Sequence, residues 1–205
     1  MGRHDPALTI AISGRAGLAR GLYAGTLLRT PLGWAPIESL CPGELVLTRD
    51  RGLCPVVSLT REERPALWAV RIPAGALENG ADLLLPPGQP VLVQTDFAMP
   101  YTGEAEALVP ASSLEGWRGI VPVARATTAP IWQLRLDRSS LIEAGPGVVV
   151  GLEGSEEAQA DLLTRLLSAP ERPVLPLAAA RHLVATLIGA ATGEGMVQAA
   201  LARGA

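Results

Sequence analysis

Residues 21–50 read GLYAGTLLRTPLGWAPIESLCPGELVLTRD, and this stretch decides the fold. Gly25-Thr26 precedes a short apolar run, and Pro31-Leu32-Gly33 then predicts a turn into a second strand. Pro42-Gly43 introduces a third run that ends near Asp50. Apolar runs punctuated by Gly and Pro in this way are typical of short strands joined by tight turns. The stretch therefore predicts the beginning of a β domain.

The same punctuation continues to about residue 150, and it predicts a mostly β fold with no convincing helix in this part. The expected strands are residues 8–12, 25–29, 44–48, 56–59, 67–72, 91–94, 107–109, 120–126, 131–136 and 140–144. The pattern changes at Gly151. Ser155 is a candidate N-cap of a first helix, and apolar residues between Leu177 and Ile188 form one face of a second. We therefore expect an N-terminal extension (1–20), a β domain (21–150) and a helical C-terminal appendage (151–205).

Composition excludes several classes of function. All 17 cationic side chains are Arg, so chemistry that needs a lysine amine is excluded. The net charge of -3 is spread along the chain and gives no basic face for nucleic acid. No apolar run reaches the roughly 20 residues that a membrane span needs, and the first residues do not resemble a secretory signal. These features predict a cytoplasmic protein without a membrane span.

The two cysteines, Cys41 and Cys54, flank a hairpin that is expected to turn at residues 50–52. In a simple register Cys54 faces a residue near Thr48, so a disulfide is not implied. No His, Asp or Glu stands near the cysteines at metal-ligand spacing. The sequence predicts free thiols, no metal site and no cofactor.

Several segments, taken in order along the chain, are similar to one known family. They are residues 25–31 (GTLLRTP), 42–50 (PGELVLTRD), 70–77 (VRIPAGAL), 83–92 (LLLPPGQPVL), 107–111 (ALVPA), 134–138 (LRLDR) and 172–176 (RPVLP). This series resembles Hint domains, the module shared by the Hedgehog C-terminal region and inteins, and a bacterial Hint subfamily in particular. The resemblance spans most of the chain and implies a flattened β disc with two pseudo-symmetric halves.

The resemblance also implies where catalytic residues of the family would stand. A Cys or Ser at the first residue of a Hint domain attacks the preceding carbonyl, and a histidine handles the proton of the departing amide. Here Gly21 occupies the nucleophile position, Gln89 one histidine position and Ser139 another, while Thr26 is the nearest hydroxyl downstream of Gly21. Glycine has no side chain, and glutamine carries no proton near neutral pH. These four residues are therefore expected to line a remnant pocket, with no catalytic residue among them.

These replacements predict a degenerate Hint domain that acts as a binding or structural module. Such a module is expected to have a protein partner or to self-associate through the C-terminal helices, although the apolar stripe of the last helix packs more simply on the sheet. One alternative is a self-cleaving domain that uses Thr26 or Cys41. The lack of any histidine between His4 and His182 disfavours it. The other alternative is an unrelated β-rich scaffold subunit.

Two further features bear on what the chain contacts. Trp117 stands between charged neighbours and is a candidate exposed anchor. The strand expected at residues 8–12 would add to the edge of a sheet, where it would cover free backbone groups.

Overall fold

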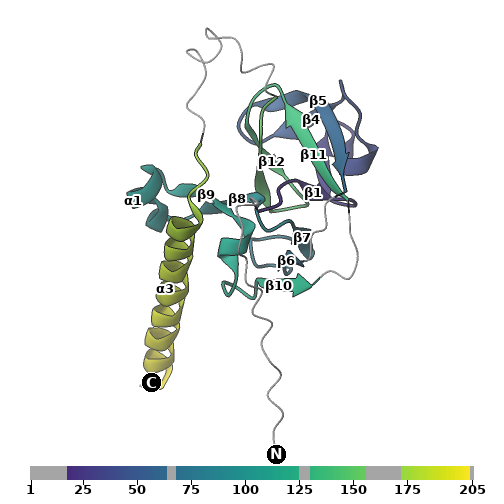
Figure 1. The fold of residues 1–205 in the computed structure, drawn as a ribbon. Helices are drawn as coiled ribbons and strands as arrows, with labels where there is room; N and C mark the ends of the chain where they lie inside the picture. The colour runs from purple at the N-terminus through teal and green to yellow at the C-terminus, as the bar shows by residue number, and fades with distance from the viewer. Residues whose placement is uncertain (1–17, 64–67, 125–129, 156–171, 204–205) are drawn as a thin grey trace, which may run out of the picture.

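The computed structural model describes residues 18–63, 68–124, 130–155 and 172–203, and its fold is mostly β, as the sequence predicts. Figure 1 shows the strands gathered into one body, from which helix α3 runs away to the C-terminus. The strands are β1 (Leu22–Tyr23), β2 (Leu27–Thr30), β3 (Gly33–Pro36), β4 (Leu45–Thr48), β5 (Gly52–Glu62), β6 (Trp68–Ile72), β7 (Leu83–Leu85), β8 (Pro90–Gln94), β9 (Glu106–Pro110), β10 (Val121–Ala124), β11 (Ile131–Leu136), β12 (Ser140–Glu143) and β13 (Val149–Leu152). The helical elements are η1 (Ile37–Ser39), η2 (Asp96–Ala98), α1 (Met99–Thr102), η3 (Ala111–Leu114) and α3 (Leu177–Arg203).

Three sheets organise the described strands. The largest has the order β1-β11-β5-β4-β12-β13-β8-β9, the second is β10-β6-β7, and the third is the β2-β3 hairpin. The order of the large sheet interleaves strands that lie far apart in the sequence. Strand β1, where the β domain begins, pairs antiparallel with β11, with Leu22 opposite Trp132. The start of the domain is therefore placed against a strand more than a hundred residues later.

The hairpin of β4 and β5 shows how the sequence pattern produces the sheet. Thr48 pairs with Gly52, and the three residues between them make the turn. Inward-facing Val46, Cys54 and Val56 are buried, while the alternate residues are exposed, as period-two side-chain alternation requires. Cys54 lies opposite Val46 and not opposite Thr48, because residues 49–51 make the turn and not the expected residues 50–52. Both thiols are free, with Cys41 exposed and Cys54 buried.

The strand boundaries follow the expected ones in part. β11 covers residues 131–136 as expected, but β5 is far longer than residues 56–59 because its second half pairs with β11. The short strands β1 and β7 and the whole of β13 were not expected from the sequence. β13 continues past residue 150, and Gly154 then forms a parallel bridge with Leu136. The segment after β13 thus stays attached to the sheet.

One large core joins the strands to the helical end of the chain. It includes Leu22 from β1, Val91 from β8, Leu136 from β11 and Leu183 from α3, all of them buried. Trp117 belongs to this core and is 8% exposed, so the idea that it is an exposed anchor is wrong. Its charged neighbour is accommodated because the Arg118 guanidinium lies over the indole ring.

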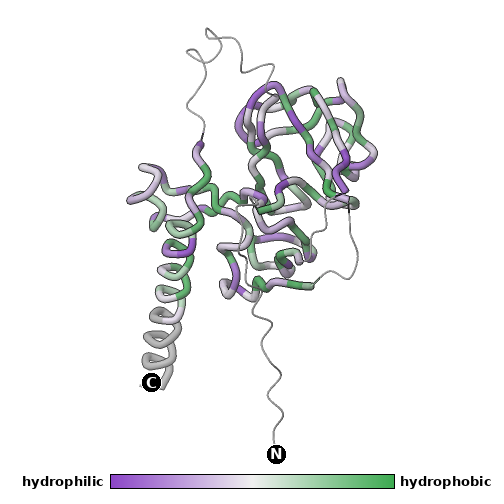
Figure 2. The backbone as a smooth tube through the Cα atoms, viewed as in Figure 1, coloured by the Kyte–Doolittle hydropathy of each residue, from purple (hydrophilic) through white to green (hydrophobic). Residues whose placement is uncertain are grey.

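The C-terminal part is fixed to the β body by two kinds of contact. Arg172 forms an ion pair with Glu106, at 2.9 Å, and Val174 forms a parallel bridge with Leu108 of β9. Helix α3 then buries its first apolar face, through Ala180, Leu183, Val184 and Leu187. Figure 2 shows hydrophobic residues in these first turns, where the helix meets the β body. The expected packing of the last helix on the domain is therefore found, and the helix spans Leu177–Arg203, beyond the apolar face that ends at Ile188.

Two expectations lie outside the described residues, namely the strand at residues 8–12 and the helix following Ser155. In the described part of the chain, no helix has both the length and the apolar character needed to cross a membrane.

Candidate functional site

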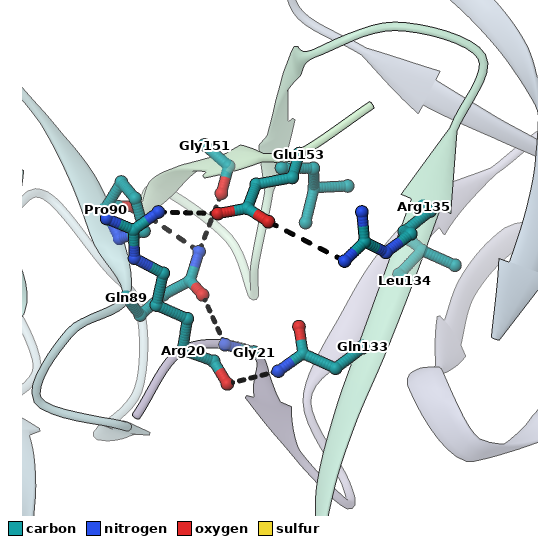
Figure 3. A pocket seen from close by; sticks show the side chains of 10 residues that line it. Arg20, Gly21, Gln89, Pro90, Gln133, Leu134, Arg135, Gly151 and Glu153 are labelled. Atoms are coloured by element: carbon teal, nitrogen blue, oxygen red, sulfur yellow. Dashed lines mark hydrogen bonds and ion pairs between the residues drawn. The ribbon is translucent and has the colours of Figure 1, made fainter. Parts of the chain in front are cut away.

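The peptide bond between Arg20 and Gly21 is held by two side-chain amides. The Gly21 N–H donates to Oε1 of Gln89 at 2.8 Å, and Nε2 of Gln133 donates to the Arg20 carbonyl at 2.7 Å. The N–H and the carbonyl of this peptide unit are therefore both hydrogen-bonded, one to Gln89 just before β8 and the other to Gln133 in β11. Figure 3 shows the two amides approaching this bond from opposite sides. We call Gln89 and Gln133 the amide clamp.

Gln89 is positioned by the turn that leads into β8. Its backbone N–H donates to the Pro86 carbonyl at 3.0 Å, and its own carbonyl accepts from Ala111 N–H at 2.9 Å. The side chain is 2% exposed, and Nε2 donates to the Gly151 carbonyl at 2.8 Å. A buried amide that both donates and accepts in this way is oriented, because a flipped amide would place like groups face to face. Gln89 thereby connects the start of the domain with β13.

Gly21 lies tightly against β11. Its φ of 110° lies in the region that side-chain-bearing residues rarely adopt. A Cβ added there would lie 2.5 Å from Ile131 Cγ2 and 2.7 Å from the Trp132 carbonyl oxygen. Both distances are well inside ordinary van der Waals contact. The space that a side chain at this position would need is filled by β11.

Two arginines and one carboxylate border the clamp. Nη1 of Arg20 lies 2.5 Å from Oε1 of Glu153, and Nη2 of Arg135 lies 3.8 Å from Oε2 of the same carboxylate. All three side chains are partly exposed, so water screens these attractions. The small hollow between them is lined also by Gly21, Gln89 and Gln133. Its polar atoms thus belong to neutral amides and to paired charges.

This arrangement has no group suited to proton transfer near neutral pH. The amides of Gln89 and Gln133 hold no exchangeable charge, and an arginine stays protonated. The remaining acid, Glu153, is paired with Arg20. Among the described residues, no group of three or more His, Cys, Asp or Glu side chains is placed to hold a metal ion. The two amides hold the Arg20–Gly21 peptide unit through its N–H and its carbonyl.

The four positions taken from the family resemblance do not come together as one set. Gly21 and Gln89 are in direct contact, as described above. Thr26 is buried in the turn after β1, where its N–H donates to Tyr23 O and its carbonyl accepts from Ile37 N–H. Ser139 lies between β11 and β12, and its Oγ accepts from Gly154 N–H at 3.4 Å. Neither Thr26 nor Ser139 lines the hollow.

Sequence reasoning missed Gln133, Glu153 and Arg20. Gln133 had a detectable signal, since it is a polar residue inside the otherwise predicted strand at 131–136. Glu153 and Arg20 had none, because an exposed charged residue near a strand end is common and their partnership depends on the pairing of β1 with β11 and β13 with β8.

Comparison with known proteins gives one family. The sequence profile of the Hint domain family matches residues 21–147. Among solved structures, a bacterial intein-like domain from Clostridium thermocellum aligns with a TM-score of 0.48 and 15% identity, over 64% of this chain and 98% of that chain. A splice-inactive variant of the AceL NrdHF class 3 split intein aligns with a TM-score of 0.46 and 16% identity, over 66% of this chain and 98% of that chain. No curated protein matches the sequence.

Proposed function

Because this chain belongs to the Hint domain family, we propose that it is a member that no longer processes itself and that serves as a binding or structural module. The observation that carries the proposal is the closed space at Gly21. A self-processing step would begin with a nucleophile on residue 21 attacking the Arg20 carbonyl carbon. Gly21 offers no such atom, and β11 occupies the place where one would stand.

The proton chemistry is missing as well. Departure of the Gly21 nitrogen from the Arg20 carbonyl requires that the nitrogen gain a proton. Oε1 of Gln89 accepts a hydrogen bond from that nitrogen at 2.8 Å. An amide oxygen in this position accepts a hydrogen bond from the N–H and has no proton to donate to the nitrogen. The contact therefore stabilises the intact peptide.

The alternative of self-cleavage with another nucleophile has two candidates. Thr26 is buried in the turn after β1. Cys41 is exposed, and its N–H donates a hydrogen bond to Oε2 of Glu44. Neither residue lines the hollow beside the Arg20–Gly21 bond. This favours the reading in which the bond stays intact.

The test is the intact mass of the full chain during a day at neutral pH, with and without a strong thiol. We expect the mass to stay at 21.3 kDa in both samples. A second variant, Gly21→Cys with Gln89→His, supplies a nucleophile and a histidine, and we expect it to stay uncut as well, because the space for the side chain is filled. Spontaneous loss of residues 1–20 from the natural chain would overturn the proposal. Thr26→Ala and Cys41→Ser would then identify the nucleophile.

Self-association through the C-terminal helix is part of the same proposal. Leu187 is buried against the β body, and α3 continues from there to Arg203, which is about 24 Å of further helix at 1.5 Å per residue. Figure 1 shows this part of α3 projecting away from the strands. Sedimentation velocity over a hundredfold range of concentration tests it. A constant monomer mass of 21.3 kDa would exclude self-association and leave a different protein as the partner.

A further inference from the structure

We propose that residues 18–21, the entry segment, are the resident ligand of this site, and that the site recognises residues 19–21 as an Ala-Arg-Gly peptide with Glu153 selecting the arginine. The inference rests on the proposed function, since a self-processing domain would release this segment. It adds a binding activity to the fold, with a ligand of defined sequence supplied by the chain itself.

The main chain of the entry segment is bound at three successive residues. Gly88 N–H donates to the Ala19 carbonyl at 2.8 Å. Gln133 donates to the Arg20 carbonyl and Gln89 accepts from the Gly21 N–H, as described for the amide clamp. Three hydrogen bonds to consecutive residues fix the register of the segment, in the way that peptide-binding domains use main-chain bonds for affinity.

At each of residues 19–21, a different neighbour restricts which side chain fits. Ala19 packs against the small cluster formed by Tyr23, Ala69 and Ile131. Arg20 reaches Glu153, and Gly21 fits because β11 leaves no room for a Cβ. A small apolar residue, a cation and a glycine are thus each matched by a different neighbour. This is the combination expected of a sequence-selective site.

Gly88 supplies independent support for binding of the entry segment. A Cβ at Gly88 would lie 2.4 Å from the Leu18 carbonyl oxygen and 2.7 Å from Leu18 Cβ. Gly88 is not among the residues with positive φ, so the turn itself does not require glycine here. The absence of a side chain is instead explained by the close approach of the entry segment. The missing side chain at Gly88 thus leaves room for Leu18 beside the turn before β8.

The first experiment measures how fast trypsin cleaves the Arg20–Gly21 bond, since trypsin cleaves after arginine. In the folded full chain this bond should resist trypsin, although the Arg20 side chain is half exposed. Gly88→Ala forces a methyl group into Leu18 and should speed cleavage after Arg20 about tenfold or more, as overpacking of a close contact typically does. Gly80→Ala is the matched control, because a Cβ at Gly80 meets no heavy atom within 4 Å and Gly80 also lacks a positive φ. Mass spectrometry identifies the released fragment, and cleavage after Arg135 within β11 reports unfolding of the domain.

The results of this experiment separate the possibilities. Protection in the natural chain and in Gly80→Ala, with selective cleavage after Arg20 in Gly88→Ala, supports the resident ligand. Rapid cleavage after Arg20 in the natural chain while Arg135 stays protected would overturn it and leave the proposed function intact. If Gly88→Ala is also cut after Arg135, the domain has unfolded, and hydrogen exchange at the Gly21 N–H of the natural chain decides instead. Exchange there as fast as in an unstructured peptide would refute binding.

The second experiment tests selection of arginine. Glu153→Gln and Arg20→Gln should each raise hydrogen exchange at the Gly21 N–H by about two- to fivefold, the effect of one exposed ion pair. The double variant should exchange no faster than Glu153→Gln alone, because Glu153→Gln already removes the contact with Arg20, together with the longer contact with Arg135. Glu63→Gln, which breaks the comparable exposed pair with Arg61, is the control and should leave this exchange unchanged. Unchanged exchange in both single variants would show that Glu153 does not select the arginine.

Discussion

Replacing Gly21 by alanine tests whether the position is closed by its neighbours or only by its backbone conformation. A residue with a Cβ loses about 1–2 kcal/mol in left-handed backbone. Contact of that Cβ with Ile131 Cγ2 and the Trp132 carbonyl should add about 1–3 kcal/mol of overpacking. Gly25→Ala provides the matched control, because Gly25 also has a positive φ, of 82°, but has open space around its missing side chain. The difference between the two variants isolates the steric term.

Urea unfolding of both variants and of the natural chain measures this difference. We expect Gly21→Ala to lose about 2–5 kcal/mol of unfolding free energy and Gly25→Ala only about 1–2 kcal/mol. In thermal unfolding the gap of about 1–3 kcal/mol corresponds to roughly 2–12 °C for a chain of this size. Equal losses in the two variants would refute the closed space at Gly21, and with it the main support for the proposal that the chain does not process itself.

Three further predictions concern the rest of the fold. Burial raises the pKa of Glu115 more than Arg181 lowers it. The protonated carboxyl of Glu115 therefore stabilises the folded state fully below the ordinary glutamate pKa of about 4.3, and this stabilisation is lost as pH rises through the raised pKa. Glu115→Gln should therefore raise the unfolding midpoint at pH 7 and leave it unchanged at pH 3, and an equal gain at both values would contradict this. Leu183→Ala should cost about 2–5 kcal/mol because this side chain carries α3 into the main core, whereas exposed Ala185→Ser should cost little in the same urea titration. Cys41 should react with a thiol reagent in the folded chain and Cys54 only on unfolding, and equal labelling rates by mass spectrometry would show that the β4–β5 hairpin opens.

Much of the fold could be predicted because strand patterns are local. The run at residues 131–136 became β11 without change, and the Pro-Gly entry at residues 42–43 was followed by β4. The turn of the next hairpin was less predictable, since it lies at residues 49–51, one residue earlier than expected, which moved the partner of Cys54 from Thr48 to Val46. Short strands such as β1 have too few residues to show an alternation, and only their pairing defines them.

The site was predictable only where the family pattern fixed a position. Gly21 and Gln89 were located in this way, and the structure brings them into hydrogen-bonding contact. Gln133 and Glu153 come from strands whose order in the sheet no local pattern encodes. Their approach to Arg20 depends on long-range pairing, which a single sequence does not display.

The closed space at Gly21 restricts the paths by which this sequence can evolve. A single codon change at this position meets both a side chain and a backbone carbonyl of β11. Shortening Ile131 would remove one obstacle, but the Trp132 carbonyl can move only with β11, which is paired along its length with β5. Placing a nucleophile at residue 21 would thus require compensating changes in β11 in addition to the change at residue 21 itself. Mutation can therefore change the peptide that the domain holds more readily than it can place a nucleophile at residue 21.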